Sequence, residues 1–578
     1  MKKWFKYAKP YVPYFILGPL CMLIEVAGEA VMPRLLGILI NRANEGLLTS
    51  GMSLGIMALM IVIALVMMAG GVGGAYFASK ASVNYAADLR ADVYSRIQMF
   101  SFENIDKFST GSLVTRLTND VTQMQNLINM MMRMALRAPG MMIASLIMAI
   151  ILKPKLSVVF AVSIPVMLLS VGFIILRGFP LFSKVQTKLD ALNSTVQENV
   201  TNVRVVKSFV REDHETEKFR RANRELKNTG MSASKVMIFM QPVMTLIMNV
   251  TVVVVVLIGS RLVLNRDGGM LPGDLTSFIS YVTQILMSLV MVTFMLTFSS
   301  RAMASARRIR EVLDEPVTLN DDGAAFKDLH VQRGDVEFRN VTFRYYKNSE
   351  DTVLDGIDLK IPGGSTVGII GSTGCGKSTL VSMIPRLYDC DGGQVLVDGV
   401  DVKDYSLVNL RDGIGMVLQK NTLFSGTIAE NLRWGDEQAD DETVRRMAEY
   451  AQADKFVSSF KDGYETMLDQ GGNNVSGGQK QRLCIARALL KQPKILILDD
   501  STSAVDTATE AMIRRAFREE LPGSTKIIIA QRITSVMESD MIVVMNDGRI
   551  TGIGTHEQLL ESNVEYREIY ESQIGGNS

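Results

Sequence analysis

Long apolar runs alternate with long polar runs over the first 300 residues, and this pattern predicts membrane-spanning helices. A helix needs about 20 mainly apolar residues to cross a bilayer. Because backbone polar groups cannot stay unpaired in lipid, each apolar run is expected to be helical. The predicted spans are residues 14–40, 53–79, 128–152, 156–176, 236–264 and 275–299.

The connections between these spans alternate in length and charge. Those after the second and fourth spans run for about 50 to 60 residues and contain many Lys and Arg, whereas the others are short. Basic connections stay on the cytoplasmic side, so we expect both long connections and both termini to be cytoplasmic. The long connections have an amphipathic helical pattern, so the spans should continue as helices into the cytoplasm.

The pattern changes after residue 307, where a charged, proline-containing segment precedes a region of alternating strands and helices. Such alternation is typical of an α/β domain with a parallel sheet. We therefore predict a transmembrane domain at 1–310, a linker at 311–334 and an α/β domain at 335–578.

Composition excludes few classes of binding partner or site. The net charge of +1 gives no indication of a nucleic-acid partner, and none is expected. The four cysteines lack the spacing of a disulfide framework or a zinc site. The 36 methionines suit a promiscuous apolar binding surface, although packing and lipid contact account for most of them.

Charged residues inside the first predicted span need an explanation. Glu25 and Glu29 lie four residues apart, and Arg34 follows. Charge in a bilayer is costly and marks either a functional site or a pair inside the helix bundle. We interpret these residues as a structural group in which Glu25 or Glu29 pairs with Arg34 or stays protonated. Contact with a transported compound is the alternative.

The segment GSTGCGKST, residues 371–379, fits the pattern GxxxxGK[ST] between an apolar strand (366–370) and a helix. In such a loop, glycines let backbone N–H groups surround phosphate oxygens, the lysine reaches the terminal phosphates, and the serine binds Mg²⁺. The predicted nucleotide-binding residues are Gly371, Ser372, Thr373, Gly374, Cys375, Gly376, Lys377, Ser378 and Thr379.

The apolar strand KILILDD ends in two aspartates. Ligands bind at the carboxyl ends of strands in open α/β sheets, so Asp499 is expected to hold Mg²⁺ through water, with Asp500 beside it. Together with the phosphate loop, this strand predicts binding of ATP or GTP with Mg²⁺.

About 100 residues after the phosphate loop, the stretch VSGGQ begins a predicted helix. It is close to the LSGGQ signature of ABC transporters, and the whole chain resembles a type IV ABC exporter half-transporter. The resemblance implies an α-helical membrane bundle of six transmembrane helices with long cytoplasmic extensions, followed by an α/β nucleotide-binding domain. It also implies that two such domains dimerise head to tail. Each ATP then lies between one chain's phosphate loop and the other chain's signature, here Ser476, Gly477, Gly478 and Gln479.

Other positions match the family's motifs. The resemblance implies that Tyr345 stacks on adenine, that Gln419 of the Q-loop is a further magnesium ligand, and that Asp506 ends the D-loop SAVD. The stretches 100–121 and 197–215 resemble the two coupling regions that contact nucleotide-binding domains.

Two catalytic positions depart from the family pattern. Asp500 replaces the usual glutamate, which acts as general base on the attacking water, and Gln531 replaces the usual switch histidine. Loss of a positioned general base typically costs 10² to 10⁴ in rate, or roughly 3 to 5 kcal/mol. Gln531 can donate a hydrogen bond but carries no switchable charge. The alternative is that both residues are tolerated variants in an active homodimer.

Because the signature is intact, we predict a heterodimer with a different half-transporter. This chain would contain a slowly hydrolysing ATP site. Its signature would complete the hydrolytically competent ATP site of the partner. The predicted function is ATP-driven export of amphipathic or drug-like compounds across the inner (plasma) membrane, in contact with membrane lipids. A homodimeric lipid or peptide exporter, or an ATP-gated regulatory or channel-like ABC protein, is the alternative.

Overall fold

The computed structural model describes residues 2–264, 270–346, 351–500 and 505–574. The chain divides into two compact units. The first comprises residues 1–97 and 111–314, and the second comprises residues 98–110 and 315–578. The segment 98–110, which lies within the predicted transmembrane domain, thus belongs to the second unit.

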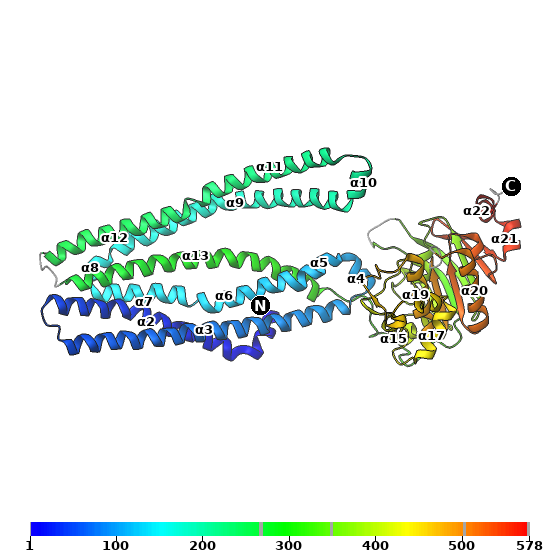
Figure 1. Cartoon of the computed structure of the whole chain (residues 1–578), viewed down its shortest axis with the longest axis horizontal. Coiled ribbons are helices and arrows are strands. Elements are labelled where there is room, and N and C mark those ends of the chain that lie inside the picture. The colour runs from blue at the N-terminus through cyan, green and yellow to red at the C-terminus, as the bar shows by residue number, and fades with distance from the viewer. Residues whose placement is uncertain (1, 265–269, 347–350, 501–504, 575–578) are drawn as a thin grey trace. The chain divides into compact units, whose positions relative to one another are not determined.

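The regular elements in the described part of the first unit are all helices, joined by short turns (Figure 1). Its helices are α1 (Lys2–Ala8), α2 (Val12–Asn44), α3 (Ser50–Gln98), α5 (Thr110–Thr115), α6 (Val121–Met134), α7 (Arg137–Leu152), α8 (Pro154–Ser157), α9 (Val159–Thr201), α10 (Val203–Ser208), α11 (Glu212–Met237), α12 (Met240–Leu264) and α13 (Pro272–Asp314). A short 3₁₀ turn, η1 (Lys9–Tyr11), precedes α2, and a π-helical turn, η2 (Arg116–Asp120), precedes α6.

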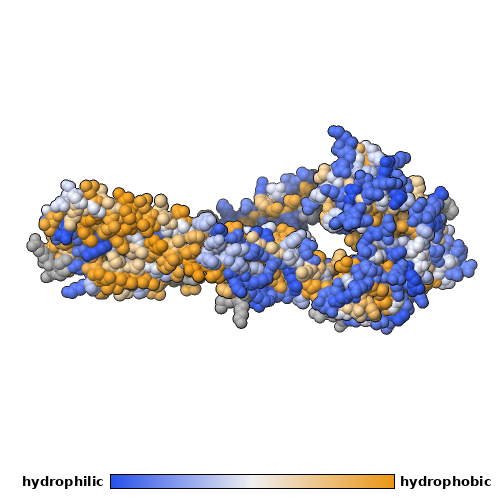
Figure 2. Space-filling model, turned by 90° about the horizontal axis from the view of Figure 1, so that it is seen from below, coloured by the Kyte–Doolittle hydropathy of each residue, from blue (hydrophilic) through white to orange (hydrophobic). Residues whose placement is uncertain are grey.

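Among the described residues, six helical segments are long and apolar enough to cross a membrane. They are Lys3–Asn44, Ser50–Gln98, Thr110–Leu152, Pro154–Thr201, Glu212–Leu264 and Pro272–Thr293. Figure 2 shows apolar residues gathered at the left of the view, where the spans lie. The prediction of six spans is confirmed. The helices α3 and α9 run well past their apolar parts, so the long connections are helical as expected.

Helices α9 to α12 form an arm that diverges from the bundle of α2, α3, α6, α7 and α13 (Figure 1). Within the arm, α11 ends at Met237 and α12 begins at Met240. The break has a local cause, because Pro242 has no N–H to donate to the carbonyl of Ile238. The arm is therefore a hairpin of two long helices, one of them interrupted.

Helices α2 and α13 touch backbone to backbone. A Cβ atom placed on Gly273 would lie 2.0 Å from the carbonyl oxygen of Gly37, so glycine alone fits there. Several hydrogen bonds also join the helices, among them Gly273 N to Asn41 Oδ1 (2.7 Å), Ser277 Oγ to the Pro33 carbonyl (2.6 Å), Tyr281 OH to the Ala30 carbonyl (2.9 Å), and Gln284 Nε2 to the Glu29 carbonyl (2.9 Å). These contacts fix the register of the two helices.

The second unit is built on a six-stranded sheet with the order β12-β11-β3-β10-β9-β6. Only the edge strand β12 is antiparallel to its neighbour. The strands are β1 (Val336–Phe343), β2 (Leu354–Ile361), β3 (Thr366–Gly371), β4 (Gly392–Val397), β5 (Val400–Asp401), β6 (Ile414–Val417), β7 (Gly426–Thr427), β8 (Met467–Leu468), β9 (Ile495–Asp499), β10 (Thr525–Ile529), β11 (Met541–Asn546) and β12 (Arg549–Gly554). The predicted α/β fold is confirmed.

A second, antiparallel sheet with the order β2-β1-β4-β5 accompanies the first. The helices of this unit are α4 (Phe102–Lys107), α14 (Lys377–Ser382), α15 (Leu407–Asp412), α16 (Ile428–Leu432), α17 (Asp441–Tyr450), α18 (Asp454–Val457), α19 (Gly477–Leu490), α20 (Thr507–Glu520), α21 (His556–Ser562) and α22 (Val564–Ile574). Short 3₁₀ turns lie at Gly463–Glu465 and Ile533–Ser535.

The central strands of the six-stranded sheet are buried on both faces. All five residues of β9 and all five of β10 are buried, which fits the apolar runs ILIL in β9 and III in β10. Strands β3, β9 and β10 are parallel neighbours, so their carboxyl ends meet at one edge. The segments that follow these ends carry the residues described next.

Candidate nucleotide-binding site

The loop between β3 and α14 has a shape that requires glycine. Gly371 and Gly376 have φ angles of 156° and 96°. A Cβ atom would lie 2.1 Å from the Met545 carbonyl oxygen at Gly371 and 2.8 Å from the Val353 carbonyl oxygen at Gly376. The loop thus turns tightly against its neighbours before the helix begins, which is the geometry of a phosphate-binding loop.

Lys377 lies at the start of α14 and is 9% exposed. Its ammonium group donates hydrogen bonds to the carbonyl oxygens of Gly371 (3.0 Å) and Ser372 (2.7 Å). These bonds hold the cation across the loop. Phosphate oxygens, which form stronger charge-assisted hydrogen bonds, are suited to replace the two carbonyls.

Ser378 and Asp499 provide a pair of oxygen ligands. The Ser378 hydroxyl donates to Asp499 Oδ1 at 2.8 Å. Burial raises the pKa of the Asp499 carboxyl, and the nearby Asp500 carboxylate raises it further, whereas the Ser378 hydrogen bond and Lys377 oppose this rise. Mg²⁺ prefers such hard oxygen ligands and takes its remaining ones from water and phosphate. The residues present therefore fit Mg²⁺ with ATP.

Within the described residues, no group of three or more His, Cys, Asp or Glu side chains is arranged to hold a metal ion. A magnesium ion at Ser378 and Asp499 would thus depend on nucleotide and water oxygens, as is usual for this metal.

Asp500 follows β9 in a left-handed conformation, with φ of 47°. Its Oδ2 accepts a hydrogen bond from Gln531 Nε2 at 2.9 Å, and its carboxylate is also hydrogen-bonded to the Gln419 side chain. Burial raises the pKa of this carboxyl, while Lys377 and the two amides oppose the rise. The structure thus places three predicted site residues, Asp500, Gln419 and Gln531, in one contact group. Gln419 bonds here to Asp500.

Gln531 is fixed by a residue that the sequence did not indicate. Gln573 on α22 donates from Nε2 to the Gln531 carbonyl oxygen at 2.8 Å and accepts from the Ile533 N–H at 2.8 Å. The C-terminal helix therefore braces the loop that carries the switch position. Nothing in the local sequence distinguishes Gln573 from other polar residues of α22.

Tyr345 lies beside the phosphate loop. Its hydroxyl is 2.9 Å from Thr379 Oγ1, and its ring packs edge-on against Phe343 and Tyr388, with centroid distances of 5.0 and 5.3 Å. The ring is 41% exposed. An exposed aromatic face held at this place is suited to stack on a base.

Tyr388 connects this aromatic group to α4, which lies in the first predicted coupling region. The Tyr388 ring lies 6.0 Å from that of Phe102, and its hydroxyl donates to Asp106 Oδ2 at 2.8 Å. Burial and this hydrogen bond raise the pKa of Tyr388. Sequence reasoning missed Tyr388, although its position shortly after the phosphate-loop helix marks it as a neighbour of the site.

The signature residues occupy a separate surface. Ser476 is the N-cap of α19: its hydroxyl accepts from the Gln479 N–H at 3.3 Å, and its own N–H donates to Gln479 Oε1 at 2.9 Å. Ser476 and Gly477 are exposed, and Gly478 is half-buried. Among the residues that the structure describes, no hydrogen bond or ion pair joins Ser476–Gln479 to the phosphate loop. The helix N-terminus is open to an anion from another molecule.

Asp506 is the N-cap of α20, where its Oδ1 accepts from the Thr509 N–H at 2.9 Å. This backbone hydrogen bond lowers the pKa of the Asp506 carboxyl. Val505 of the predicted D-loop is buried, whereas Ser503 and Ala504 lie outside the described residues.

In the membrane unit, the expected pairing of Glu25 or Glu29 with Arg34 is wrong. Arg137 of α7 forms ion pairs with Glu25 Oε1 and Glu29 Oε1, each at 2.9 Å. Arg34 pairs instead with Asp274 of α13 at 2.9 Å. Both partners come from helices far along the chain, so spacing within the first span gave no indication of them.

Glu29 and Arg137 also line a cavity of about 400 Å³ between α2, α7 and α13. Glu29 Oε2 is buried without a hydrogen-bond partner among the described atoms. The other lining residues are Met141, Ile279, Ser280, Thr283, Gln284, Met287, Ser288 and Met291. The cavity combines flexible thioethers with a few polar groups, as ligand sites commonly do.

Comparison with known proteins agrees with these features. Residues 15–289 match the family described as ABC transporter transmembrane region, and residues 354–503 match the family described as ABC transporter. The ABC transporter ATP-binding protein YfiB of Bacillus subtilis is 37% identical over 577 residues, which cover 100% of this chain and 99% of that protein. YgaD of the same organism, named as a candidate multidrug export ATP-binding/permease protein, is 32% identical and covers 99% of each chain.

Among solved structures, a bacterial Atm1-family ABC exporter with ATP bound has a TM-score of 0.79. The alignment covers 99% of each chain at 23% identity, so this likeness concerns the fold.

Proposed function

The chain belongs to the ABC transporters, and from this membership we propose that it is one half of a heterodimeric exporter whose own ATP site hydrolyses slowly. Membership implies ATP binding and transport coupled to ATP hydrolysis. The six apolar helices make the chain a multi-pass membrane protein. Bound Mg²⁺ would neutralise charge on the phosphates next to Ser378 and Asp499.

The observation that carries the proposal is the contact group of Asp500, Gln419 and Gln531. The Asp500 carboxylate is bound to two amides, and one of them, Gln531, cannot become positively charged. An aspartate in place of glutamate also retracts the carboxylate by about one bond length, and a misplacement near 1 Å can cost on the order of 10²-fold in rate. Both features favour slow hydrolysis while ATP binding is retained.

The position of the signature supports the proposal of a partner chain. Ser476 caps an exposed helix N-terminus, and no hydrogen bond or ion pair joins Ser476–Gln479 to this chain's phosphate loop among the described residues. A second half-transporter would bring its phosphate loop to this signature. We propose that this partner carries the catalytic glutamate and the switch histidine, because they are replaced here.

For the transported compound, we propose hydrophobic or amphipathic small molecules. The cavity beside Glu29 and Arg137 supports this class, because its thioethers accept varied apolar shapes while the charged pair and Gln284 offer polar contacts. The membrane would be the inner (plasma) membrane. Both termini would be cytoplasmic, where ATP is available to the nucleotide-binding unit.

The test compares the chain purified alone with the chain co-expressed with a half-transporter that carries the catalytic glutamate and the switch histidine. The measurement is ATP hydrolysis in lipid nanodiscs with and without amphipathic compounds. We expect weak hydrolysis from the chain alone and compound-stimulated hydrolysis from the complex. A dimer of this chain alone with brisk, stimulated hydrolysis would refute the heterodimer and leave a homodimeric exporter.

A further inference from the structure

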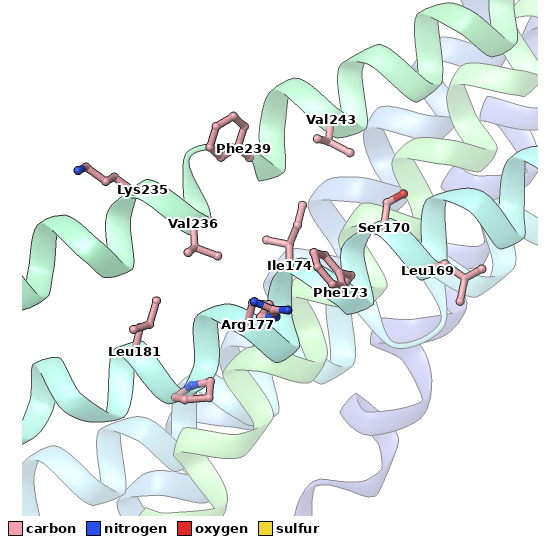
Figure 3. A pocket seen from close by; sticks show the side chains of 11 residues that line it. Leu169, Ser170, Phe173, Ile174, Arg177, Leu181, Lys235, Val236, Phe239 and Val243 are labelled. Atoms are coloured by element: carbon pink, nitrogen blue, oxygen red, sulfur yellow. The ribbon is translucent and has the colours of Figure 1, made fainter.

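The arm contains a cavity of about 990 Å³ between α9 and the α11–α12 helices (Figure 3). It lies where prolines weaken both helices: Pro180 cannot donate to the carbonyl of Leu176, and Pro242 follows the break after α11. At membrane depth, irregular backbone is tolerated where it lines a cavity. The volume is at the upper end of the roughly 300–1,000 Å³ typical of small-molecule sites.

The walls of this cavity are mainly apolar. Phe173 of α9 and Phe239, in the break between α11 and α12, line it and are each 62% exposed, so they have little to pack against within the first unit. The other apolar wall residues are Leu169, Ile174, Leu181, Val236 and Val243. An acyl chain would bury these surfaces from water and fill the space between the helices.

Two cations stand among these apolar residues. Arg177 and Lys235 both line the cavity, and Figure 3 shows them on the two facing helices, with the Lys235 ammonium group turned away from Arg177. The Arg177 guanidinium carbon lies 5.3 Å from the centroid of the Phe173 ring, which helps to orient it. Within the described residues, neither cation has an ion pair.

Carboxylates are absent from the surrounding sequence. Residues 154–189 and 226–264 contain no Asp or Glu. The carboxylates that bound these stretches already have partners: Asp190 accepts from Gln186 at 2.9 Å, and Glu225 pairs with Lys188 at 2.7 Å. The cavity therefore has a positive end that nothing nearby on its own two helices neutralises.

The depth of the cavity matches that of a lipid headgroup. The part of α9 before Arg177 is apolar, whereas Lys184, Gln186 and Lys188 follow within three turns. Basic residues at this boundary, between membrane helices, are suited to bind acidic headgroups.

We propose that this cavity binds one anionic phospholipid from the leaflet on the side of the arm's polar half. The Arg177 guanidinium would donate hydrogen bonds to the phosphate, and the Lys235 ammonium would add a positive charge. An acyl chain would lie along Phe173 and Val243. A zwitterionic lipid would bring a third cation to the two already present and should bind less well. This inference does not rest on the ATP site, and it requires that the partner half-transporter leave the cavity open.

The experiment uses the full chain in vesicles that contain equal amounts of phosphatidylglycerol and phosphatidylcholine with identical acyl chains. One lipid at a time carries a photoreactive group on its acyl chain, and labelled peptides are quantified. We expect peptides from residues 169–181 and 235–243 to be labelled by phosphatidylglycerol at least about fivefold more than by phosphatidylcholine, since each cation near the surface contributes about 1 kcal/mol.

Charge-removing variants test whether the cavity causes this preference. Arg177→Gln combined with Lys235→Gln should reduce the labelling ratio toward one, and Arg177→Lys should retain most of it. The matched control is Lys184→Gln combined with Lys227→Gln, which removes two cations from the same helices outside the cavity and should retain the preference.

Four results would overturn the proposal. The first is equal labelling by both lipids in the wild-type chain, and the second is an unchanged labelling ratio in the Arg177→Gln, Lys235→Gln variant. The third is an equal fall of the labelling ratio in the control variant. The fourth is loss of labelling when the partner half-transporter is co-expressed. The third would mean a diffuse basic surface, and the last would mean a subunit interface.

Discussion

At the scale of single residues, the geometry around Asp500 is the most informative feature of the nucleotide-binding unit. The side chain follows the central strand, adopts a left-handed backbone conformation and is bound to the amides of Gln419 and Gln531. Asp and Asn tolerate this conformation better than most side chains. The carboxylate is thus held in place by its neighbours, and its reach toward an attacking water is set by its length.

Restoring the family's residues should raise turnover at this site. We expect Asp500→Glu combined with Gln531→His to increase hydrolysis on the order of 10- to 100-fold, because a longer carboxylate and a chargeable switch return together. The assay uses the complex with a partner whose phosphate-loop lysine is replaced by alanine, so that only this chain's site turns over. Each single substitution serves as a control. No gain in the double variant would mean that another step limits this site.

The buried Asp499 carboxyl should lower the free energy of unfolding of the chain, although it is needed to bind Mg-ATP. Burial raises the pKa of its carboxyl in the folded state. As pH rises from the unfolded value of about 3.9, the unfolded chain releases this proton first, so the folded state binds more protons and the free energy of unfolding falls. Asp499→Asn removes this effect and keeps an acceptor for Ser378.

We therefore expect Asp499→Asn to raise the melting temperature of the nucleotide-free chain at pH 7, with a smaller difference near pH 4. Mg-ATP should stabilise the wild-type chain and fail to stabilise the variant. Asp506→Asn, at a helix N-cap where Asn is also favourable, is the matched control and should change the melting temperature little. A lower melting temperature for Asp499→Asn would contradict the argument.

At the scale of elements, α4 and the aromatic residues of the second unit form a continuous contact path. Thr379 of the phosphate loop contacts Tyr345, Tyr345 packs on Tyr388, and Tyr388 contacts Phe102 and Asp106 of α4. A change at the phosphate loop can thus reach α4 through side chains that are in direct contact.

We expect Tyr388→Phe to lower the amount of compound transported per ATP hydrolysed several-fold, because the ring remains but its hydrogen bond to Asp106 is lost. The cost in stability should be about 1 kcal/mol. The matched control is Tyr405→Phe, which removes the hydrogen bond from Tyr405 OH to the Val397 carbonyl without touching α4. Transport and hydrolysis are measured together in vesicles. An equal fall in both rates for Tyr388→Phe would argue against a coupling role.

Sequence reasoning predicted the elements better than the contacts between them. Six spans, the helical extensions and the strand before the phosphate loop follow from local apolar patterns, and the structure contains them. Arg137 as the partner of Glu25 and Glu29, and Tyr388 as the partner of Asp106, depend on helices and loops that meet only in the folded chain. The antiparallel sheet was missed because β1 and β2 are buried on one face only, so their apolar signal is weaker.

At the scale of the whole molecule, we propose that the partner's ATP site carries most of the hydrolysis. Substitutions in this chain's signature and in its phosphate loop should therefore differ in their effect on total hydrolysis. In the complex, Gly477→Asp in this chain should reduce total hydrolysis on the order of 10²-fold, because it places a negative charge where the partner's ATP binds. Lys377→Ala should leave most of the hydrolysis intact, because it affects only the slow site. ATP hydrolysis by the purified complex distinguishes the two. The reverse ranking would show that this chain's own site carries the turnover.

The contact between α2 and α13 limits how the membrane unit can move. A slide of one residue along a helix is about 1.5 Å, which would drive Gly37 and Gly273 past each other and break the hydrogen bonds of Asn41, Ser277 and Tyr281 at the same time. The two helices should therefore travel as one rigid body. Any hinge within this unit is then expected in the arm, at the interruption between α11 and α12, where the backbone is already broken.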